Sequence, residues 1–75
     1  SIAYHLQTSS PTSIIIYDLM GNAVKNLFSG FESPGYKIIN WDATDNNGDL
    51  VSSGMYFYKL QVGKSFDIKR MMYLK

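Results

Sequence analysis

The chain has no cysteine and only one histidine, His5. Disulfides, on which many small secreted domains depend, are therefore excluded. A zinc site or a catalytic triad would need partners for His5 that the sequence does not supply in any familiar spacing. We expect His5 to be a surface strand residue, and we expect a protein without cofactor, metal or catalytic activity, because no acid–base or nucleophile pair is legible.

Long apolar runs and an excess of one charge are also missing. No stretch approaches the ~20 apolar residues that span a membrane. Seven basic and six acidic residues give a net charge of +1, so no nucleic-acid partner is indicated. The chain starts at Ser1-Ile2 without an initiator Met or a signal peptide. We therefore expect residues 1–75 to be one domain and a fragment of a larger protein.

What the chain does have is aromatic residues, at 15% of the sequence, and repeated alternation of apolar and polar side chains. Both features favour strands, and no stretch shows a capped helical period. The pattern predicts six strands, at residues 2–7, 13–19, 23–28, 36–41, 55–62 and 66–75. Turns recur every ~8–12 residues, which is typical of an all-β antiparallel sandwich of two packed sheets.

Alternation also predicts which side chains face the core. We expect Ile14 and Ile16 inside, together with Ile39 and Trp41, and Lys37 at the rim. Residues 55–62 are apolar on both faces at their start, which favours a central strand.

Some stretches break the strand pattern. Val24 and Leu27 are inward candidates three residues apart, so we expect a bulge or bend there. The last strand alternates only in its first half, which suggests a second bulge near Lys69-Arg70. Residues 8–12 and 29–35 are predicted to be connections, since they carry Pro, Gly and Ser.

Acidic and amide side chains crowd one loop, at Asp42, Asp45, Asn47 and Asp49. Calcium takes six to eight oxygen ligands at fixed loop positions, and here the EF-hand glycine is out of place and no Glu follows. We expect these side chains to cap turns through bonds to the backbone instead.

Five aromatic residues raise the question of a sugar-stacking platform. In a domain this small, the same side chains are needed to build the core, and period-two placement predicts that role. The five are Tyr36, Trp41, Tyr56, Phe57 and Tyr58.

Three motifs in order carry a resemblance. They are the Asp18-Leu19-Met20-Gly21-Asn22 turn with Val24, the stretch from Pro34-Gly35 through Trp41-Asp42 to Gly54-Met55-Tyr56, and the Lys-Arg-rich end at residues 69–75. Together they resemble the C-terminal sorting domain of type IX secretion, and equally the Ig-like domain of the flagellar hook-capping protein. The resemblance spans essentially the whole chain and implies an Ig-like β-sandwich of six to seven strands, residues 1–75 being the C-terminal fragment of a larger secreted protein.

The resemblance to a sorting domain implies a definite function. The domain would direct a cargo domain through the periplasm to the bacterial cell surface, where the outer-membrane secretion and sortase machinery would bind it. The segment read by that machinery would be Lys69, Arg70, Met71, Met72, Tyr73, Leu74 and Lys75. Framework positions would be Asp18, Gly21, Val24, Gly35, Trp41, Asp42, Asp45, Gly48, Gly54 and Tyr56.

Other functions stay open. The domain is alternatively an accessory module of a secreted hydrolase, packing on it or binding polysaccharide, or a structural domain of a surface assembly such as the flagellar cap. Sorting domains usually have a further Asn-Pro-rich strand before the equivalent of Ile2. Without it one sheet has an open edge, which a neighbouring chain could occupy.

Overall fold

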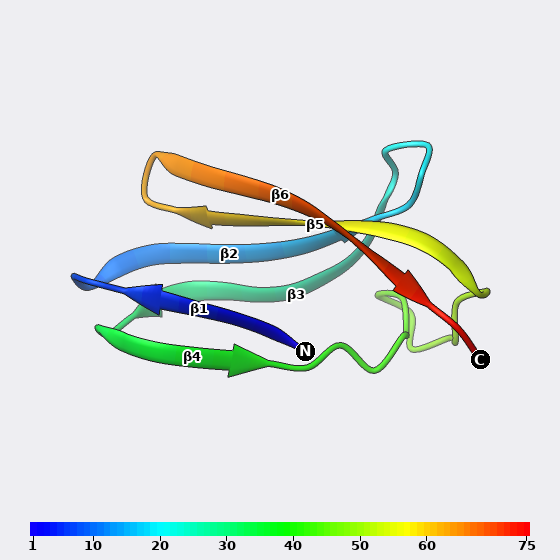
Figure 1. The fold of residues 1–75 in the computed structure, drawn as a ribbon, viewed down its shortest axis with the longest axis horizontal. Coiled ribbons are helices and arrows are strands. Elements are labelled where there is room, and N and C mark those ends of the chain that lie inside the picture. The colour runs from blue at the N-terminus through cyan, green and yellow to red at the C-terminus, as the bar shows by residue number, and fades with distance from the viewer.

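The computed structural model describes residues 1–75 and consists of strands joined by turns and loops (Figure 1). The strands are β1 (Ile2–Leu6), β2 (Ser10–Tyr17), β3 (Ala23–Glu32), β4 (Gly35–Ile39), β5 (Gly54–Val62) and β6 (Ser65–Tyr73). The prediction of six strands is confirmed. No helix of the length and apolarity needed to cross a membrane is present.

The strands form two antiparallel sheets, as an Ig-like sandwich requires. One sheet has four strands in the order β3-β2-β5-β6, and the other pairs β1 with β4. In Figure 1 the two-stranded sheet lies below the four-stranded one. β5 lies between β2 and β6, so its prediction as a central strand is confirmed. Both sheets are therefore built from strands far apart in the sequence.

The core lies between the sheets and is centred on β2. Ile14 and Ile16 are fully buried, as their alternation predicted, and Ile2 and Tyr56 pack against them. Ile39 and Trp41 are half-buried at the margin of this cluster. A core of this size leaves stability dependent on a few side chains.

The irregularity predicted around Val24 and Leu27 is confirmed. Along β2 the partners of successive residues are Phe28, Asn26, Lys25 and Ala23, so Leu27 and Val24 are the two residues that the register skips. Each is an extra residue on β3, which lets both turn toward the core despite their spacing.

Other boundaries were wrong. Residues 10–12 belong to β2 and not to a turn, because they pair with residues 30–32 of β3. Pro11 is tolerated there because it lies at the strand end, outside the β2–β5 pairing that begins at Thr12. Residues 29–32 continue β3 by pairing with the start of β2. The fourth and sixth strands end at Ile39 and Tyr73, before Trp41 and Lys75. No bulge occurs near Lys69-Arg70, since the β5–β6 register is unbroken from Gly54 to Val62.

A polar clasp joins the two sheets at one edge. Tyr4 and Lys37 are direct partners in the β1–β4 pair. The Tyr4 hydroxyl donates to Oε1 of Glu32, at the end of β3, over 2.9 Å, and the Lys37 Nζ lies 3.5 Å from Oε2 of Glu32. The Lys37 head thus reaches the rim, as predicted. Burial, with the Glu32 hydrogen bond and charge, raises the pKa of Tyr4 to about 12.

Candidate interaction surfaces

The turn between β2 and β3 is closed by Asp18. Its Oδ1 accepts the backbone N–H of Met20 at 3.0 Å and of Asn22 at 2.9 Å. The main chain adds two bonds, from Gly21 N–H to Asp18 O and from Asp18 N–H to Asn22 O. The hydrogen bonds to the carboxylate, above all the one from the Asn22 backbone N–H, lower the pKa of the Asp18 carboxyl. Asp18 therefore stabilises the turn fully at pH values above its ordinary pKa, and this stabilisation is lost as the pH falls through the lowered pKa.

The same turn recurs in the long loop between β4 and β5 (residues 40–53). Asp45 Oδ1 accepts from the N–H of Asn47 and Asp49 at 2.9 and 3.0 Å, and the two main-chain bonds are repeated with Gly48 and Asp49. Gly21 and Gly48 share a φ of 86°, a conformation that disfavours side chains with a Cβ. The repeat is visible in the sequence as Asp-x-x-Gly-Asn/Asp, although a shared turn was not predicted from it.

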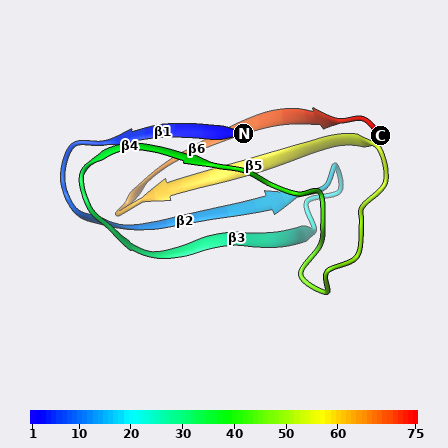
Figure 2. The same ribbon diagram turned by 90° about the horizontal axis from the view of Figure 1, so that it is seen from below.

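The long loop is anchored to the edge of β3 at its bulges. Asn46 donates its N–H to Val24 O at 3.0 Å, and its side-chain oxygen accepts the Asn26 N–H at 2.9 Å. Lys25 Nζ reaches Thr44 Oγ1 and Asp45 O. Figure 2 shows the loop leaving β4 and passing beside the start of β3 before it reaches β5. The loop thus covers the start of the free edge of β3, from Val24 to Asn26.

Aromatic side chains fix both ends of the loop. Tyr56, near the start of β5, donates its hydroxyl to Ser52 O at 2.7 Å. A tyrosine at a strand start that bonds the backbone a few residues upstream is a corner found in Ig-like sandwiches. Trp41 packs edge-on against Tyr56, with ring centroids 5.2 Å apart, and its indole N–H donates to Thr44 O.

Of the four side chains of the long loop predicted to cap turns, Asp42 and Asp45 do so, whereas those of Asn47 and Asp49 make no hydrogen bond, so for these two the prediction was wrong. Asp42 Oδ1 accepts from the Thr44 backbone and hydroxyl, and these bonds, the hydroxyl one foremost, lower the pKa of Asp42. No group of three or more His, Cys, Asp or Glu side chains converges as metal ligands would. The remaining framework glycines lie at strand starts, Gly35 opposite Leu6 and Gly54 opposite Tyr73.

The five aromatics considered for sugar stacking do not share a face. Tyr56 is buried and Trp41 half-buried in the core, whereas Phe57 lies on the opposite face of β5. Tyr36 is exposed on the other sheet, where its ring lies 4.4 Å from that of His5. The row of coplanar exposed rings that a polysaccharide binder needs is therefore not formed by these residues.

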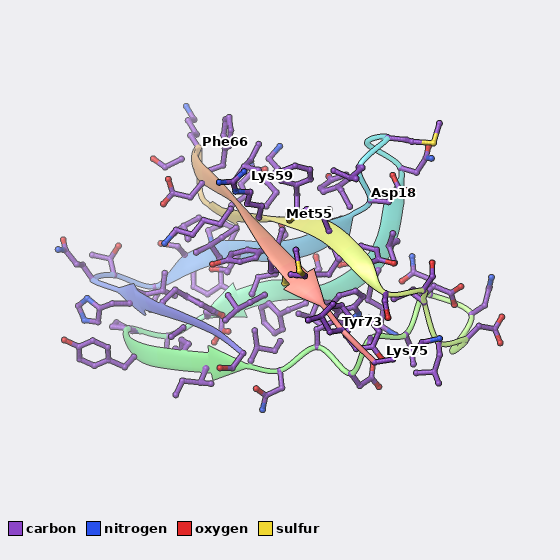
Figure 3. The ribbon with its side chains drawn as sticks, turned by 45° about the vertical axis from the view of Figure 1, so that its right-hand side comes forward. Asp18, Met55, Lys59, Phe66, Tyr73 and Lys75 are labelled. Carbon is purple, nitrogen blue, oxygen red and sulfur yellow. The ribbon has the colours of Figure 1, made fainter.

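The terminal segment, residues 69–75, is divided between core and solvent. Met71 and Tyr73 turn inward, and Tyr73 packs near Trp41. Lys69, Arg70, Met72, Leu74 and Lys75 are exposed. The Lys75 N–H donates to Ser53 Oγ, which holds the end of the chain beside the long loop (Figure 3). β6 is an edge strand, so its unpaired edge, like that of β1, presents free backbone N–H and C=O groups.

The face of the four-stranded sheet that points away from β1 and β4 is here named the outer face. Its residues alternate with the buried ones: Ile15 and Tyr17 follow Ile14 and Ile16 along β2. The cross-strand register carries the same face across β5 and β6. Its large apolar side chains on these three strands are Ile15, Tyr17, Met55, Phe57, Phe66, Ile68 and Met72.

Comparison with known proteins agrees with this architecture. A family model described as FlgD Ig-like domain matches residues 1–65, which takes in β1 to β5 and ends where β6 begins. Searches of curated proteins and of solved structures found no match. The match supports the resemblance to the Ig-like domain of the flagellar hook-capping protein and gives no support to the resemblance to a type IX sorting domain. With its two antiparallel sheets and its tyrosine corner, the chain belongs to the FlgD Ig-like domain family.

Proposed function

We propose that this chain is a non-catalytic structural module of a flagellar hook-related assembly and acts by contact with neighbouring proteins. The family match supports it. The observation that carries it is how the surface is composed. The carboxylates of Asp18, Asp42 and Asp45 are engaged in capping their own turns, whereas ten large apolar side chains are exposed. Exposed apolar side chains that lie together mark sites of protein contact, and three of the ten, Phe66, Ile68 and Met72, share one face of β6.

The test uses the full protein that carries residues 1–75 in the cells that produce it. The protein is tagged, and hook structures are purified from cells with the intact protein and from cells in which residues 1–75 are deleted. We expect the tag in the hook fraction only when the module is present. Lys64→Ala, in the exposed β5–β6 hairpin, is the matched control and should be retained. Equal retention after deletion would refute the proposed function.

A second candidate function is sorting to the cell surface, favoured by the exposure of the terminal segment on an edge strand. Met72 and Leu74 are 60% and 73% exposed, with Lys75 beyond the strand end. An edge strand with exposed apolar and basic side chains can be bound by strand addition. On this proposal the partners are the outer-membrane secretion and sortase machinery, and the location is the bacterial surface.

Sorting is tested with a reporter fused to residues 1–75 in a bacterium with type IX secretion. Truncation after Arg70 is unsuitable, because it also removes Met71 and Tyr73 from the core. The better variant is Met72→Ser with Leu74→Ser, and Leu50→Ser is the control, since Leu50 is 66% exposed but lies on the long loop. We expect surface delivery to fail only in the terminal variant. Equal delivery of both variants would exclude a terminal signal.

A further inference from the structure

The outer face is an apolar sheet face with no element of this chain over it. Phe66, Ile68 and Met72 on β6 are 57%, 58% and 60% exposed. On β5 the same face carries half-buried Met55, which pairs with Met72, and half-buried Phe57, which pairs with Arg70. Sheets exposed on one side normally alternate apolar and polar residues, with polar residues outward. On this face, apolar side chains point outward from β5 and from its two neighbours, β2 and β6. This indicates that a further layer covers the face.

The charges on the outer face are all positive. Lys59 lies opposite Ile68, with its Nζ 4.7 Å from the centroid of the Phe66 ring, and Arg70 lies opposite Phe57. Figure 3 shows Lys59 and Phe66 together toward the hairpin end of β5 and β6. No acidic residue of the four strands shares this face: Asp67 pairs with inward-facing Leu60, and Glu32 belongs to the clasp with Tyr4.

This charge pattern decides between the candidate occupants. A second copy packed face to face would place four cations, Lys59 and Arg70 of each copy, in one apolar interface with no carboxylate of either face to pair with them, which opposes association. An anionic membrane gains only a small electrostatic term from two cations, and stable binding to a membrane surface needs a larger polybasic cluster. A protein surface with apolar side chains and carboxylates satisfies both features of the face.

We propose that the outer face docks a neighbouring protein element whose apolar side chains cover Phe57, Ile68 and Met72 and whose Asp or Glu side chains pair with Lys59 and Arg70. The inference deepens the proposed function and rests on it. The layer would complete the sheet as a third layer completes a packed domain. Lys59 and Arg70, which lie among the apolar side chains, would fix the orientation of the partner.

The test is site-specific photo-crosslinking in the full protein, in the cells that produce it. Benzoylphenylalanine replaces Ile68, and the captured peptide is sequenced by mass spectrometry. Ile38 is the matched control, because it is 73% exposed but lies on the two-stranded sheet. We expect position 68 and not 38 to capture a segment that contains Asp or Glu. Lys59→Glu with Arg70→Glu should lower its yield about tenfold, and Lys at the captured acid should restore it.

The remaining outcomes overturn the proposal. These are capture of a second copy of this face, capture of nothing, capture without an acid, and binding of residues 1–75 to phosphatidylserine vesicles that the double reversal abolishes. If position 68 fails while the deletion of residues 1–75 still empties the hook fraction, the face assignment falls and the proposed function stands. If the deletion leaves the hook fraction unchanged, the proposed function falls.

Discussion

At the scale of single residues, the polar side chains of this domain are used to hold its turns and its two sheets together. Tyr4 is the residue that makes this most measurable, because its hydroxyl crosses from β1 to Glu32 of β3. In an unfolded chain tyrosine ionises near pH 10. With its pKa raised to about 12, Tyr4 contributes stability that is complete below about pH 10 and is lost as the pH rises through about 12.

Replacing Tyr4 by Phe should therefore change both the level and the pH dependence of stability. We expect Tyr4→Phe to lower the free energy of unfolding at pH 7 by about 1 kcal/mol, the contribution of one hydrogen bond. We also expect a shallower loss of stability between about pH 10 and 12. Urea denaturation across this range is the measurement, with Tyr36→Phe as control, since Tyr36 is 87% exposed. An unchanged alkaline decline in Tyr4→Phe would contradict this role.

Gly21 offers a test of backbone conformation with no change in packing. Its φ is 86°, and a Cβ there would meet no atom within 4 Å. Gly21→Ala should destabilise the domain by about 1 kcal/mol, because left-handed backbone costs an L-residue about 1–2 kcal/mol and the stiffer unfolded chain offsets only part of it. Gly30→Ala is the control: the same added methyl would make an ordinary 3.5 Å contact with Phe28. Equal thermal midpoints for the two variants would argue against conformational strain.

At the scale of elements, the long loop between β4 and β5 depends on Asn46, which stands in for a strand partner along the β3 edge. Asn46→Ala should remove the acceptor for the Asn26 N–H and let the loop lift from β3. We expect faster hydrogen exchange at the Asn26 amide, with a stability loss of about 0.5–1.5 kcal/mol. Asn47→Ala is the matched control, because its side chain makes no such bond. The prediction fails if Asn26 exchanges at the same rate in both variants.

The elements also show what could be predicted from the sequence. Strict alternation placed Ile14 and Ile16 in the core, and its breakdown at Val24 and Leu27 located the bulges. Alternation records only which side is buried, so it could not show that Ser29 to Glu32 continue β3, because that depends on the distant start of β2. The mixed pattern near Lys69 came instead from an outer face that is itself apolar, not from a bulge.

The candidate sites were harder to predict than the fold. The turn at Asp18 has a short sequence motif that is repeated at Asp45, so both turns could have been predicted from the sequence. The outer face was not, because Lys59, Ile68 and Arg70 share it only through the cross-strand register. Which residues gather on a sheet face is a property of pairing, and no local pattern contains it.

At the scale of the whole molecule, stability rests on very few buried side chains. A chain of this length has a net stability of roughly 4–11 kcal/mol. Ile16→Ala should remove about 2–5 kcal/mol of it by leaving a cavity between the sheets. At about 4–8 °C per kcal/mol, the thermal midpoint should fall by roughly 10 °C or more. Ile38→Ala, 73% exposed, should stay within about 0.5 kcal/mol. A similar loss for both would mean that the core is not where burial places it.

The strand order has a consequence for the speed of folding. Only β2–β3 and β5–β6 are pairs of consecutive strands, whereas β2–β5 and β1–β4 join distant parts of the chain. The two hairpins can each form locally, but the core around Ile14 and Ile16 exists only once the chain between them has closed. Such topologies fold in milliseconds to seconds, and stopped-flow refolding in microseconds would contradict this. Until closure, the apolar faces of both hairpins are open to other chains, so a cell that makes this domain must complete it faster than newly made copies meet.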